Sequence, residues 1–302
     1  MKKNKKKYEI IVDSCGFRTV KNLPTEKELA KFYNNFMRNA KTRPKNYQVN
    51  YNVKERQHIE LLNELRFFSI LKARPMWKEN NVSLLEVGVG EGFTIAHAKS
   101  KGWNVTGIDY SSDGIKKFNP KILKNIKIGN AFKILEKMKK QKQKFDICMI
   151  NNVLEHVIDP QKVLDDLRLL LTDNGIISIS IPNDFSDIQL EALKLGNIDK
   201  EFWVDPPEHL HYFNTKNILG FMKKQNFKII DMFSSFPLDF FLYHPGSNYI
   251  KNEKTGKAVH HARVELDLIM AKSGLKNYHK LSQSFASCSV GRNFTILVTP
   301  KK

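Results

Sequence analysis

Leu84-Leu-Glu-Val-Gly-Val-Gly-Glu-Gly92, with Gly107-Ile-Asp109 behind it, is the stretch that decides the fold. Its apolar start predicts a short buried strand, and its glycines predict a loop without side chains ahead of a helix. A nucleotide-like ligand can lie against the backbone amides of such a loop, at the helix N-terminus. Asp109 ends the next apolar run, 21 residues after Gly88, where a carboxylate can accept hydrogen bonds from both hydroxyls of a ribose. The stretch therefore predicts a nucleotide-binding strand–helix–strand unit.

Strands and helices continue to alternate beyond this unit. Apolar runs that predict strands cover 83–87, 103–108, 126–128, 145–150, 176–181, 227–232 and 293–298. Amphipathic segments that predict helices lie between most of these runs, and a further one precedes the first, from 53 to 71. Two stretches interrupt the alternation and are predicted to be insertions, at about 184–213 and at 236–290, the second with a helix from about 257 to 271. The pattern predicts an α/β domain built on a parallel sheet.

Composition agrees with a globular protein that buries a core. The chain has 302 residues, of which 41% are hydrophobic and 27% charged. No apolar run approaches the roughly 18 residues of a membrane span, and the basic start is not followed by the apolar segment of a signal peptide. Three cysteines without close spacing argue against disulfides and against a cysteine-only zinc site. We therefore expect a cytoplasmic protein without integral membrane association.

The net charge of +19 favours anionic partners, such as nucleic acid, nucleotides, phosphorylated glycans or anionic lipid surfaces. Only nine of the 50 basic residues are arginine, the residue best suited to bidentate recognition of phosphates and bases. The densest lysine runs, 2–7 and 137–144, are interpreted as a chain terminus and as the solvated end of a helix. Nucleic acid is therefore the weaker hypothesis for the partner.

The glycine loop resembles that of the class I S-adenosylmethionine (SAM)-dependent methyltransferases. In the dinucleotide-binding fingerprint the third glycine follows the second by three positions, whereas here Phe93 stands at that position and the glycine is Gly92. Glu86, just before the loop, would oppose a pyrophosphate but suits the positive sulfonium and amino group of SAM. The resemblance implies a Rossmann-like fold with a seven-stranded, mostly parallel sheet, an antiparallel last strand at 293–298, and N-terminal and C-terminal cap elements.

Two later segments extend the resemblance to about residues 80–232. Gly129-Asn-Ala131 is similar to the loop that contacts the adenine in this superfamily; the usual aspartate is replaced by Asn130, whose amide oxygen can still accept a hydrogen bond. Asn151-Asn-Val-Leu-Glu-His-Val-Ile-Asp-Pro160 resembles the segment after the fourth strand in the small-molecule branch. The resemblance implies that SAM, with S-adenosylhomocysteine as the product, is bound by Glu86, Gly88, Gly90, Asp109, Tyr110, Asn130, Ala131 and Asn151.

A second proline-containing motif points in another direction. Asp205-Pro-Pro-Glu208 resembles the Asp-Pro-Pro-aromatic signature of methyltransferases that act on the amino groups of bases. That signature directly follows the fourth strand, where this chain has Asn151-Asn-Val-Leu154 instead. No aromatic side chain is available there to stack on a flipped base, which argues against base methylation.

Three histidines are candidate acid–base residues: His156, His209 and His211. A hydroxyl nucleophile needs a base, and the ordinary pKa of histidine suits neutral pH. Pro207-Glu-His-Leu-His-Tyr-Phe213 follows the fifth strand and resembles a segment of methyltransferases from surface-glycan and nucleotide-sugar pathways. In an extended stretch His209 and His211 point the same way, either as base and substrate-orienting residue or as structural hydrogen-bonding groups. A metal held by Glu208, His209 and His211 lacks a further ligand at suitable spacing, so no metal is expected.

Residues 1–52 are predicted to be an N-terminal cap or lid, and 53–302 the methyltransferase domain. Asp13-Ser-Cys-Gly-Phe17 is similar to the zinc-ribbon region of some glycan methyltransferases, but only one of its cysteines remains, so we expect a metal-free, degenerate remnant. The aromatic stretch 32–51 would then close over the cofactor. Phe236-Pro-Leu-Asp-Phe-Phe-Leu-Tyr243 is predicted to be core, with an acceptor pocket and a homodimer contact as the alternatives.

These features predict O-methylation of a small polar acceptor: a sugar, a nucleotide sugar or a surface-glycan precursor of polysaccharide biosynthesis, captured in an anionic, phosphorylated form. Two alternatives stay open. A segment like that from Asn151 to Pro160 also occurs in ubiquinone-pathway O-methyltransferases, which act on a lipid quinone precursor. The basic surface also suits an RNA-binding or RNA-modifying protein.

Overall fold

A seven-stranded sheet with the order β5-β4-β3-β6-β7-β10-β9 forms the centre of the computed structural model, which describes residues 8–29, 31–32, 50–78 and 81–301. Five strands are mutually parallel: β3 (Ser83–Val87), β4 (Asn104–Asp109), β5 (Ile126–Ile128), β6 (Phe145–Asn151) and β7 (Leu171–Pro182). The last strand, β10 (Asn293–Pro300), runs antiparallel to both β7 and β9 (Phe227–Ser234). The predicted mostly parallel sheet with an antiparallel last strand is confirmed.

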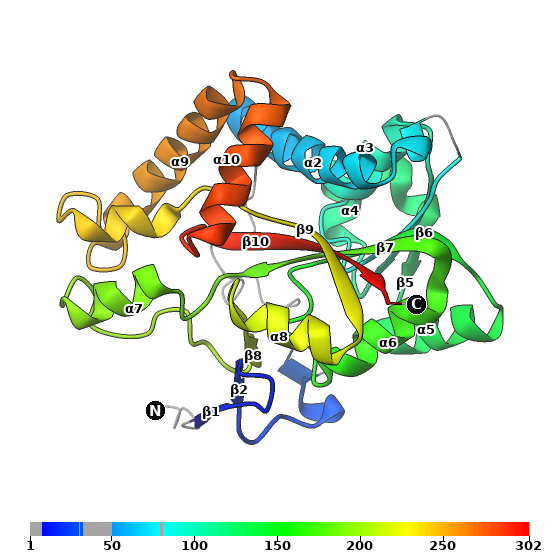
Figure 1. Cartoon of the computed structure of the whole chain (residues 1–302), viewed down its shortest axis with the longest axis horizontal. Helices are drawn as coiled ribbons and strands as arrows, with labels where there is room; N and C mark the ends of the chain where they lie inside the picture. The colour runs from blue at the N-terminus through cyan, green and yellow to red at the C-terminus, as the bar shows by residue number, and fades with distance from the viewer. Residues whose placement is uncertain (1–7, 30, 33–49, 79–80, 302) are drawn as a thin grey trace.

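Helices cover both faces of the sheet (Figure 1). One face packs against α2 (Val53–Ala73), α3 (Phe93–Ser100), α4 (Asp113–Phe118) and the 3-10 turns η1 (Pro75–Lys78) and η2 (Pro120–Asn125). The other face packs against α5 (Ala131–Lys140), α6 (Pro160–Leu170) and α8 (Asn217–Lys224). None of the helices in the described ranges is long and apolar enough to cross a membrane.

Alternate residues of each parallel strand enter different cores. In β6, Cys148 and Ile150 join the core under α5, α6 and α8, whereas Ile147 and Met149 join the core under α2 and α3. Successive side chains of a strand point to opposite faces. Since both faces are covered, the middle of the strand has to be apolar on both sides, which is the pattern that the sequence shows from Ile147 to Ile150.

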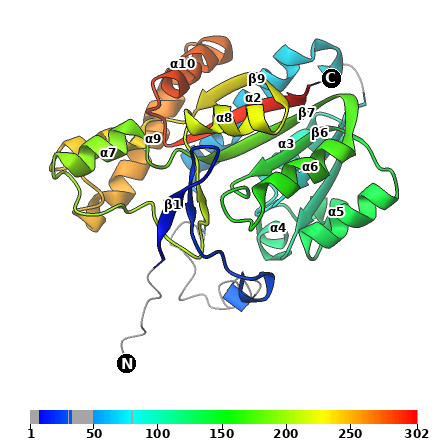
Figure 2. The ribbon, with the colours of Figure 1, turned by 60° about the horizontal axis from the view of Figure 1, so that its bottom comes forward.

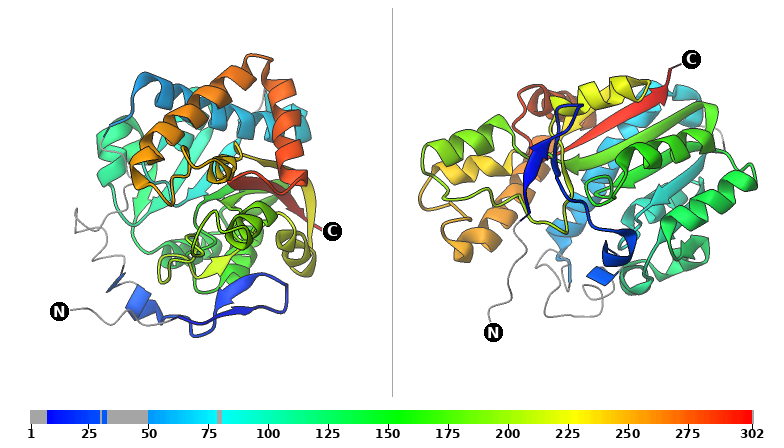
Figure 3. Two further views of the ribbon diagram at one scale, coloured as in Figure 1. Left: turned by 90° about the vertical axis from the view of Figure 1, so that its left-hand side faces the viewer. Right: turned by 90° about the horizontal axis from the view of Figure 1, so that it is seen from below.

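A small second sheet ties the N-terminus to the first insertion. β1 (Ile10–Val12), β2 (Arg18–Val20) and β8 (His211–Tyr212) pair antiparallel, on the opposite side of the main sheet from α2, α9 and α10 (Figure 3). Phe17, in the turn between β1 and β2, is 4% exposed and its ring lies 4.6 Å from that of Phe213. The hairpin around Cys15 therefore packs on the segment 207–213. Most of the aromatic stretch 32–51, which was predicted to close over the cofactor, lies outside the described residues. The same holds for the lysine run 2–7.

The two insertions form a cap at the β9–β10 end of the sheet (Figure 2). Its helical elements are α7 (Asp187–Lys194), η3 (Leu238–Tyr243), η4 (Glu253–Thr255), α9 (Gly256–Ala271) and α10 (Leu275–Ser287). The expected helix from about 257 to 271 is α9, whereas α10 was not predicted. Apolar residues do recur at helical spacing in it, at Leu275, Tyr278, Leu281 and Phe285, and its buried face also carries His279 and Ser282.

Candidate functional site

The glycine-rich loop joins β3 to α3 at the carboxyl edge of the sheet. Gly88, Gly90 and Gly92 have φ angles of +81°, +59° and +84°, in the left-handed region that favours glycine. A Cβ atom on Gly88 would lie 2.4 Å from Cγ2 of Val153. The loop therefore lies directly against the segment that follows β6, and Gly88 is required by this close approach as well as by its backbone conformation.

Asp109 tethers this loop from the end of β4. Its Oδ2 accepts a hydrogen bond from the backbone N–H of Gly90 at 2.8 Å, and its Oδ1 accepts one from the N–H of Ser111 at 2.9 Å. Burial raises the pKa of Asp109, although the backbone hydrogen bonds oppose that shift. Each carboxylate oxygen keeps a second lone pair, so Asp109 can hold the loop and still accept from ribose hydroxyls. Tyr110, the next residue, is 56% exposed.

Asn130 and Ala131 begin α5 beside the end of β5. The side-chain oxygen of Asn130 accepts a hydrogen bond from the N–H of Lys133 at 3.1 Å and so caps the helix. The oxygen that was predicted to meet the adenine thus already has a backbone partner, and it keeps one lone pair for a ligand. Ala131 is the first residue of α5 and is half-buried.

Glu86 and Asn151 form a buried pair at the ends of β3 and β6. Asn151 Nδ2 donates a hydrogen bond to Glu86 Oε1 at 2.8 Å. Glu86 Oε2 and Asn151 Oδ1 are both buried without a hydrogen-bond partner among the described residues. Burial raises the pKa of Glu86 to about 7, although Asn151 and the positive charge of Arg66 oppose the shift. Two unpaired buried acceptors side by side call for a ligand that brings donors.

Arg66 is a residue of this site that the sequence analysis missed. It lies on α2, and its charge acts on Glu86 across the packed interface between helix and sheet. Arg66 Nε is buried without a hydrogen-bond partner within the described part of the chain, and burial lowers the pKa of the guanidinium. The sequence pattern of α2 does not indicate this role, because the role depends on how α2 packs against the sheet.

The unpaired groups around Glu86 fit SAM. The amino group of the methionine moiety could donate to Glu86 and Asn151, and its carboxylate could pair with Arg66. Asp109 offers acceptor capacity for the ribose hydroxyls of the same ligand. The charges of Glu86 and Arg66 are therefore opposite to those of the amino group and the carboxylate of the methionine moiety.

His209 lies in a buried acidic cluster. Its Nδ1 is 3.8 Å from Oδ2 of Asp184, which is 1% exposed and is held by Arg292 at 2.9 Å. Both carboxylate oxygens of Glu155 are buried without a hydrogen-bond partner among the residues described. Burial by itself lowers the pKa of His209, but Asp184, Glu155 and Glu208 outweigh it, and the pKa is raised. His209 meets Asp184 and Glu155 only through the fold, because they lie in other segments, whereas Glu208 is its neighbour in the sequence.

His156 lies against His209, with the ring centroids 4.9 Å apart. Its Nδ1–H donates to the backbone oxygen of Glu208 at 2.6 Å, and its Nε2 is 3.7 Å from Oε1 of Glu155. Burial and the neighbouring charge of His209 lower the pKa of His156 to about 4. One potential ligand atom each from Glu155, His156 and His209 lies within 4.8 Å of the others, so these three, rather than Glu208, His209 and His211, could hold a metal ion.

His211 has different surroundings from His209. Its Nδ1 lies 2.8 Å from the hydroxyl of Thr19, and its Nε2 lies 2.9 Å from the backbone oxygen of Val157. The ring is 4% exposed and packs edge-on against Phe17. Only residues 211–212 of this segment form a strand, β8, and the two histidines have different hydrogen-bonding and charge partners. With both nitrogens engaged in holding the N-terminal hairpin, His211 fits the structural role.

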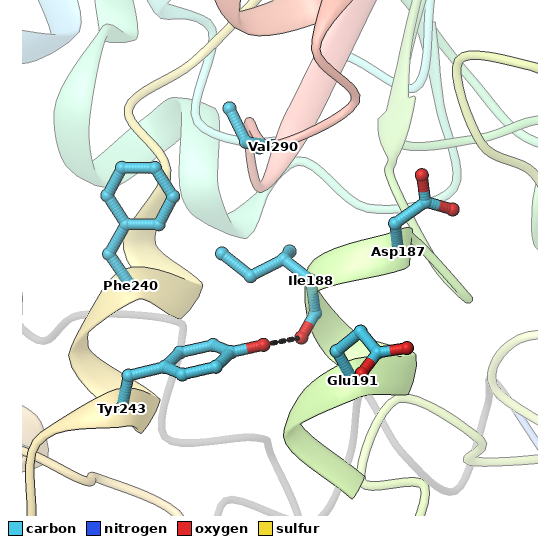
Figure 4. A pocket seen from close by; sticks show the side chains of 6 residues that line it. All are labelled: Asp187, Ile188, Glu191, Phe240, Tyr243 and Val290. Atoms are coloured by element: carbon cyan, nitrogen blue, oxygen red, sulfur yellow. Dashed lines mark hydrogen bonds between the residues drawn. The ribbon is translucent and has the colours of Figure 1, made fainter. Parts of the chain in front are cut away.

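An apolar groove of about 460 Å³ lies between α7 and η3. Figure 4 shows Ile188, Phe240 and Tyr243 lining it, with the Tyr243 hydroxyl donating to the backbone oxygen of Ile188. Phe240 is 50% exposed, whereas Leu242 is 1% exposed. The segment 236–243 is therefore partly core, as predicted, and partly the wall of a surface groove.

Most of the chain is similar to known methyltransferases. Residues 51–232 match the family described as "Methyltransferase domain". The ubiquinone biosynthesis O-methyltransferase of Pelagibacter ubique is 31% identical over 165 residues, which cover 50% of this chain and 68% of that protein. The protein of the same name from Histophilus somni is 26% identical over 152 residues, 45% of this chain and 64% of that protein. A SAM-dependent methyltransferase structure from Archaeoglobus fulgidus is 20% identical with a TM-score of 0.46, covering 80% of this chain and 93% of that one.

The family match covers the glycine loop, Asp109, the segment after β6 and the segment around His209. It therefore includes the residues that fit SAM and the acidic cluster beside them. The chain belongs to the methyltransferase-domain family and is a class I SAM-dependent methyltransferase.

Proposed function

We propose that this methyltransferase O-methylates a hydroxyl of a small organic acceptor, with His209 as the general base. The observation that carries the proposal is that His209 lies beside Asp184 and Glu155. Glu155 ends a short segment that begins in the cofactor site. Asn151, which bonds Glu86, and Glu155, which faces His209, are only four residues apart. One short segment thus joins the groups that fit SAM to the proposed base.

SAM, when bound, supplies the methyl group on a sulfonium. The acceptor oxygen forms the new bond to the methyl carbon, the carbon–sulfur bond breaks, and S-adenosylhomocysteine is the leaving group. His209 receives the hydroxyl proton on Nε2, since its Nδ1 faces Asp184. Arg292 holds Asp184 in place, so a fixed negative charge stays beside Nδ1 during the transfer.

Buried carboxylates make His209 a stronger base. Its raised pKa means that the imidazolium formed by proton uptake is stabilised by Asp184 and Glu155. His156, whose pKa is lowered to about 4, stays neutral at pH 7 and orients the cluster without competing for the proton. Glu155 acts through His209 and is a positioning residue in this scheme.

The proposed cofactor contacts are those of the sequence analysis, with one addition. Glu86 and Asn151 receive the amino group, and Arg66 pairs with the carboxylate of the methionine moiety. Asp109 accepts from the ribose, and Gly88 and Gly90 leave room for it. Tyr110, Asn130 and Ala131 border the adenine.

The acceptor class follows from charge and from the relatives. Asp184, Glu155 and Glu208 favour a neutral hydroxyl over an anionic group next to His209. The names of the relatives, ubiquinone biosynthesis O-methyltransferases, support the quinone-precursor alternative. A sugar, nucleotide-sugar or glycan acceptor of polysaccharide biosynthesis stays a prediction, as do the homodimer and the cytoplasmic location.

The test is transfer of a tritiated methyl group from SAM by the purified protein. A phenolic quinone precursor, a set of nucleotide sugars and total RNA are offered separately, and we expect label in the phenol. His209→Gln should lower the rate at least about 100-fold without changing SAM affinity. His261→Gln, at a position 44% exposed on α9, is the matched control and should keep full activity. Label in RNA alone would overturn the proposed acceptor, and an unchanged rate for His209→Gln would overturn the proposed base.

A further inference from the structure

Lysine side chains crowd one edge of the central sheet. From Asp113 to Lys144 the chain has eleven lysines, no arginine and two acidic residues, a formal charge of +9 out of the total of +19. This stretch forms α4, η2, β5 and α5. We call its exposed lysines, from Lys116 to Lys144, the basic edge. Nearly half of the net charge of the chain is therefore concentrated in about a tenth of its length.

Most of the charge of the basic edge is not neutralised by side chains that the structure describes. The half-buried Lys139 pairs with Glu136 and Asp166. Nine exposed lysines form no ion pair with any residue that the structure describes: Lys116, Lys121, Lys124, Lys127, Lys133, Lys137, Lys140, Lys142 and Lys144. An anionic partner would meet these charges without first displacing a carboxylate.

The basic edge wraps around the outermost strand, β5. Lys127 and Ile128 on that strand are both exposed, Ile128 by 47%. Lys133, Lys137 and Lys140 follow one another at helical spacing on α5 and share one face of it. A branched apolar side chain is thus set among lysines on long, flexible stems.

The basic edge lies away from the proposed acceptor site. In the sheet, the strands β4, β3 and β6 lie between β5 and β7. The acidic cluster around His209 includes Asp184, in the segment that follows β7. Figure 2 shows α4 and α5 at the opposite end of the molecule from α7 and α9. A partner held at this edge is therefore not the group that receives the methyl.

We propose that the basic edge docks the protein on an anionic phospholipid surface. Lysine is a hydrated point charge that suits a diffuse layer of headgroups, and each lysine near such a surface raises the partition coefficient about fivefold. Ile128 adds an apolar contact at the interface. RNA fits less well, because the stretch has no arginine for bidentate contacts and its two phenylalanines, Phe118 and Phe132, are half-buried rather than free to stack on bases.

The experiment is sedimentation with vesicles of phosphatidylcholine alone and of phosphatidylcholine with 30 mol% phosphatidylglycerol, on the order of the charge density that recruits basic surfaces. We expect binding only to the anionic vesicles, and its loss in about 0.5 M salt. The triple variant Lys133→Glu, Lys137→Glu, Lys140→Glu should weaken binding at least about 100-fold. A second triple variant, Lys121→Gln, Lys124→Gln, Lys127→Gln, tests the same edge without charge reversal on a helix.

The matched control is a triple variant of exposed lysines on the cap: Lys257→Glu, Lys272→Glu, Lys276→Glu. It changes the net charge by the same amount as the triple Lys→Glu variant of α5. It should bind vesicles within about threefold of the unmodified chain if the charge is local in its effect. SAM affinity serves as the folding check for all variants and does not depend on the methyl acceptor. Equal weakening by the control, equal binding to neutral vesicles, or tighter binding of a short RNA through the same lysines would each overturn the proposal.

Discussion

Replacing Gly88 with alanine should weaken folding and cofactor binding together. Its φ of +81° lies where an L side chain costs about 1 kcal/mol. The added Cβ would also meet Cγ2 of Val153 at 2.4 Å, and relief of such an overlap in a packed region costs about 1–3 kcal/mol. We therefore expect the free energy of unfolding to fall by about 2–4 kcal/mol. SAM affinity should fall as well, because the loop must shift to accommodate the methyl group.

Two further variants separate backbone strain from the overlap. Gly196 has a φ of +72° with no heavy atom of the described residues within 4 Å of an added Cβ, so Gly196→Ala should lose only about 1 kcal/mol. In a double-mutant cycle by urea unfolding, Val153→Ala should restore about 1–2 kcal/mol to Gly88→Ala, because it removes the atom in overlap. If Gly88→Ala costs no more than Gly196→Ala, the close approach of the loop and the segment after β6 is refuted.

The other predictions concern binding, pH and metal. Asp109→Ala should weaken SAM binding at least about tenfold through the lost ribose hydrogen bonds, and unchanged affinity by calorimetry would contradict the cofactor site. Arg66→Met should also weaken SAM binding at least about tenfold, and an unchanged dissociation constant would remove Arg66 from the site. His209 must be neutral to accept a proton, and its pKa is raised, so kcat should fall as the pH drops through that raised pKa. Glu155→Gln removes one of the charges that raise this pKa, so the acidic limb of the kcat profile should move to lower pH; a limb that stays in place would contradict the role of Glu155. A chelator should leave the rate unchanged, whereas a loss that an added divalent metal restores would assign a metal to the cluster around His209.

Local patterns in the sequence predicted most of the fold. Apart from Asp146, the run 145–150 is apolar at every position, which marks a strand covered on both faces. The spacing of the glycines at 88, 90 and 92 and of the acid at 109 predicts a loop for a nucleotide-like ligand, whereas SAM is implied by the resemblance to a family. α10 has the same kind of local signal in Leu275, Tyr278 and Leu281, but its polar contacts, such as that of His279 with Asp231 at 2.7 Å, could be found only in the structure.

The different roles of His209 and His211 are a second feature that the sequence could not reveal. Both stand in one short segment, and neither composition nor spacing separates a base from a structural histidine. The structure gives His211 two hydrogen-bonding partners, Thr19 and Val157, and gives His209 the carboxylate of Asp184. Each partner lies on a different element of the fold, so the distinction required the arrangement of those elements.

The sequence by itself determined the seven strands of the main sheet and most helices between them, the nucleotide-binding loop and the segments that carry the candidate residues. These features depend on interactions within a few residues, such as backbone conformation, capping and the alternation of apolar side chains. Only the tertiary structure decided that Arg66 lies beside Glu86 and that Val153 closes on Gly88. Such contacts depend on how whole helices and segments pack against the sheet, and that packing is a property of complementary surfaces that no local periodicity encodes.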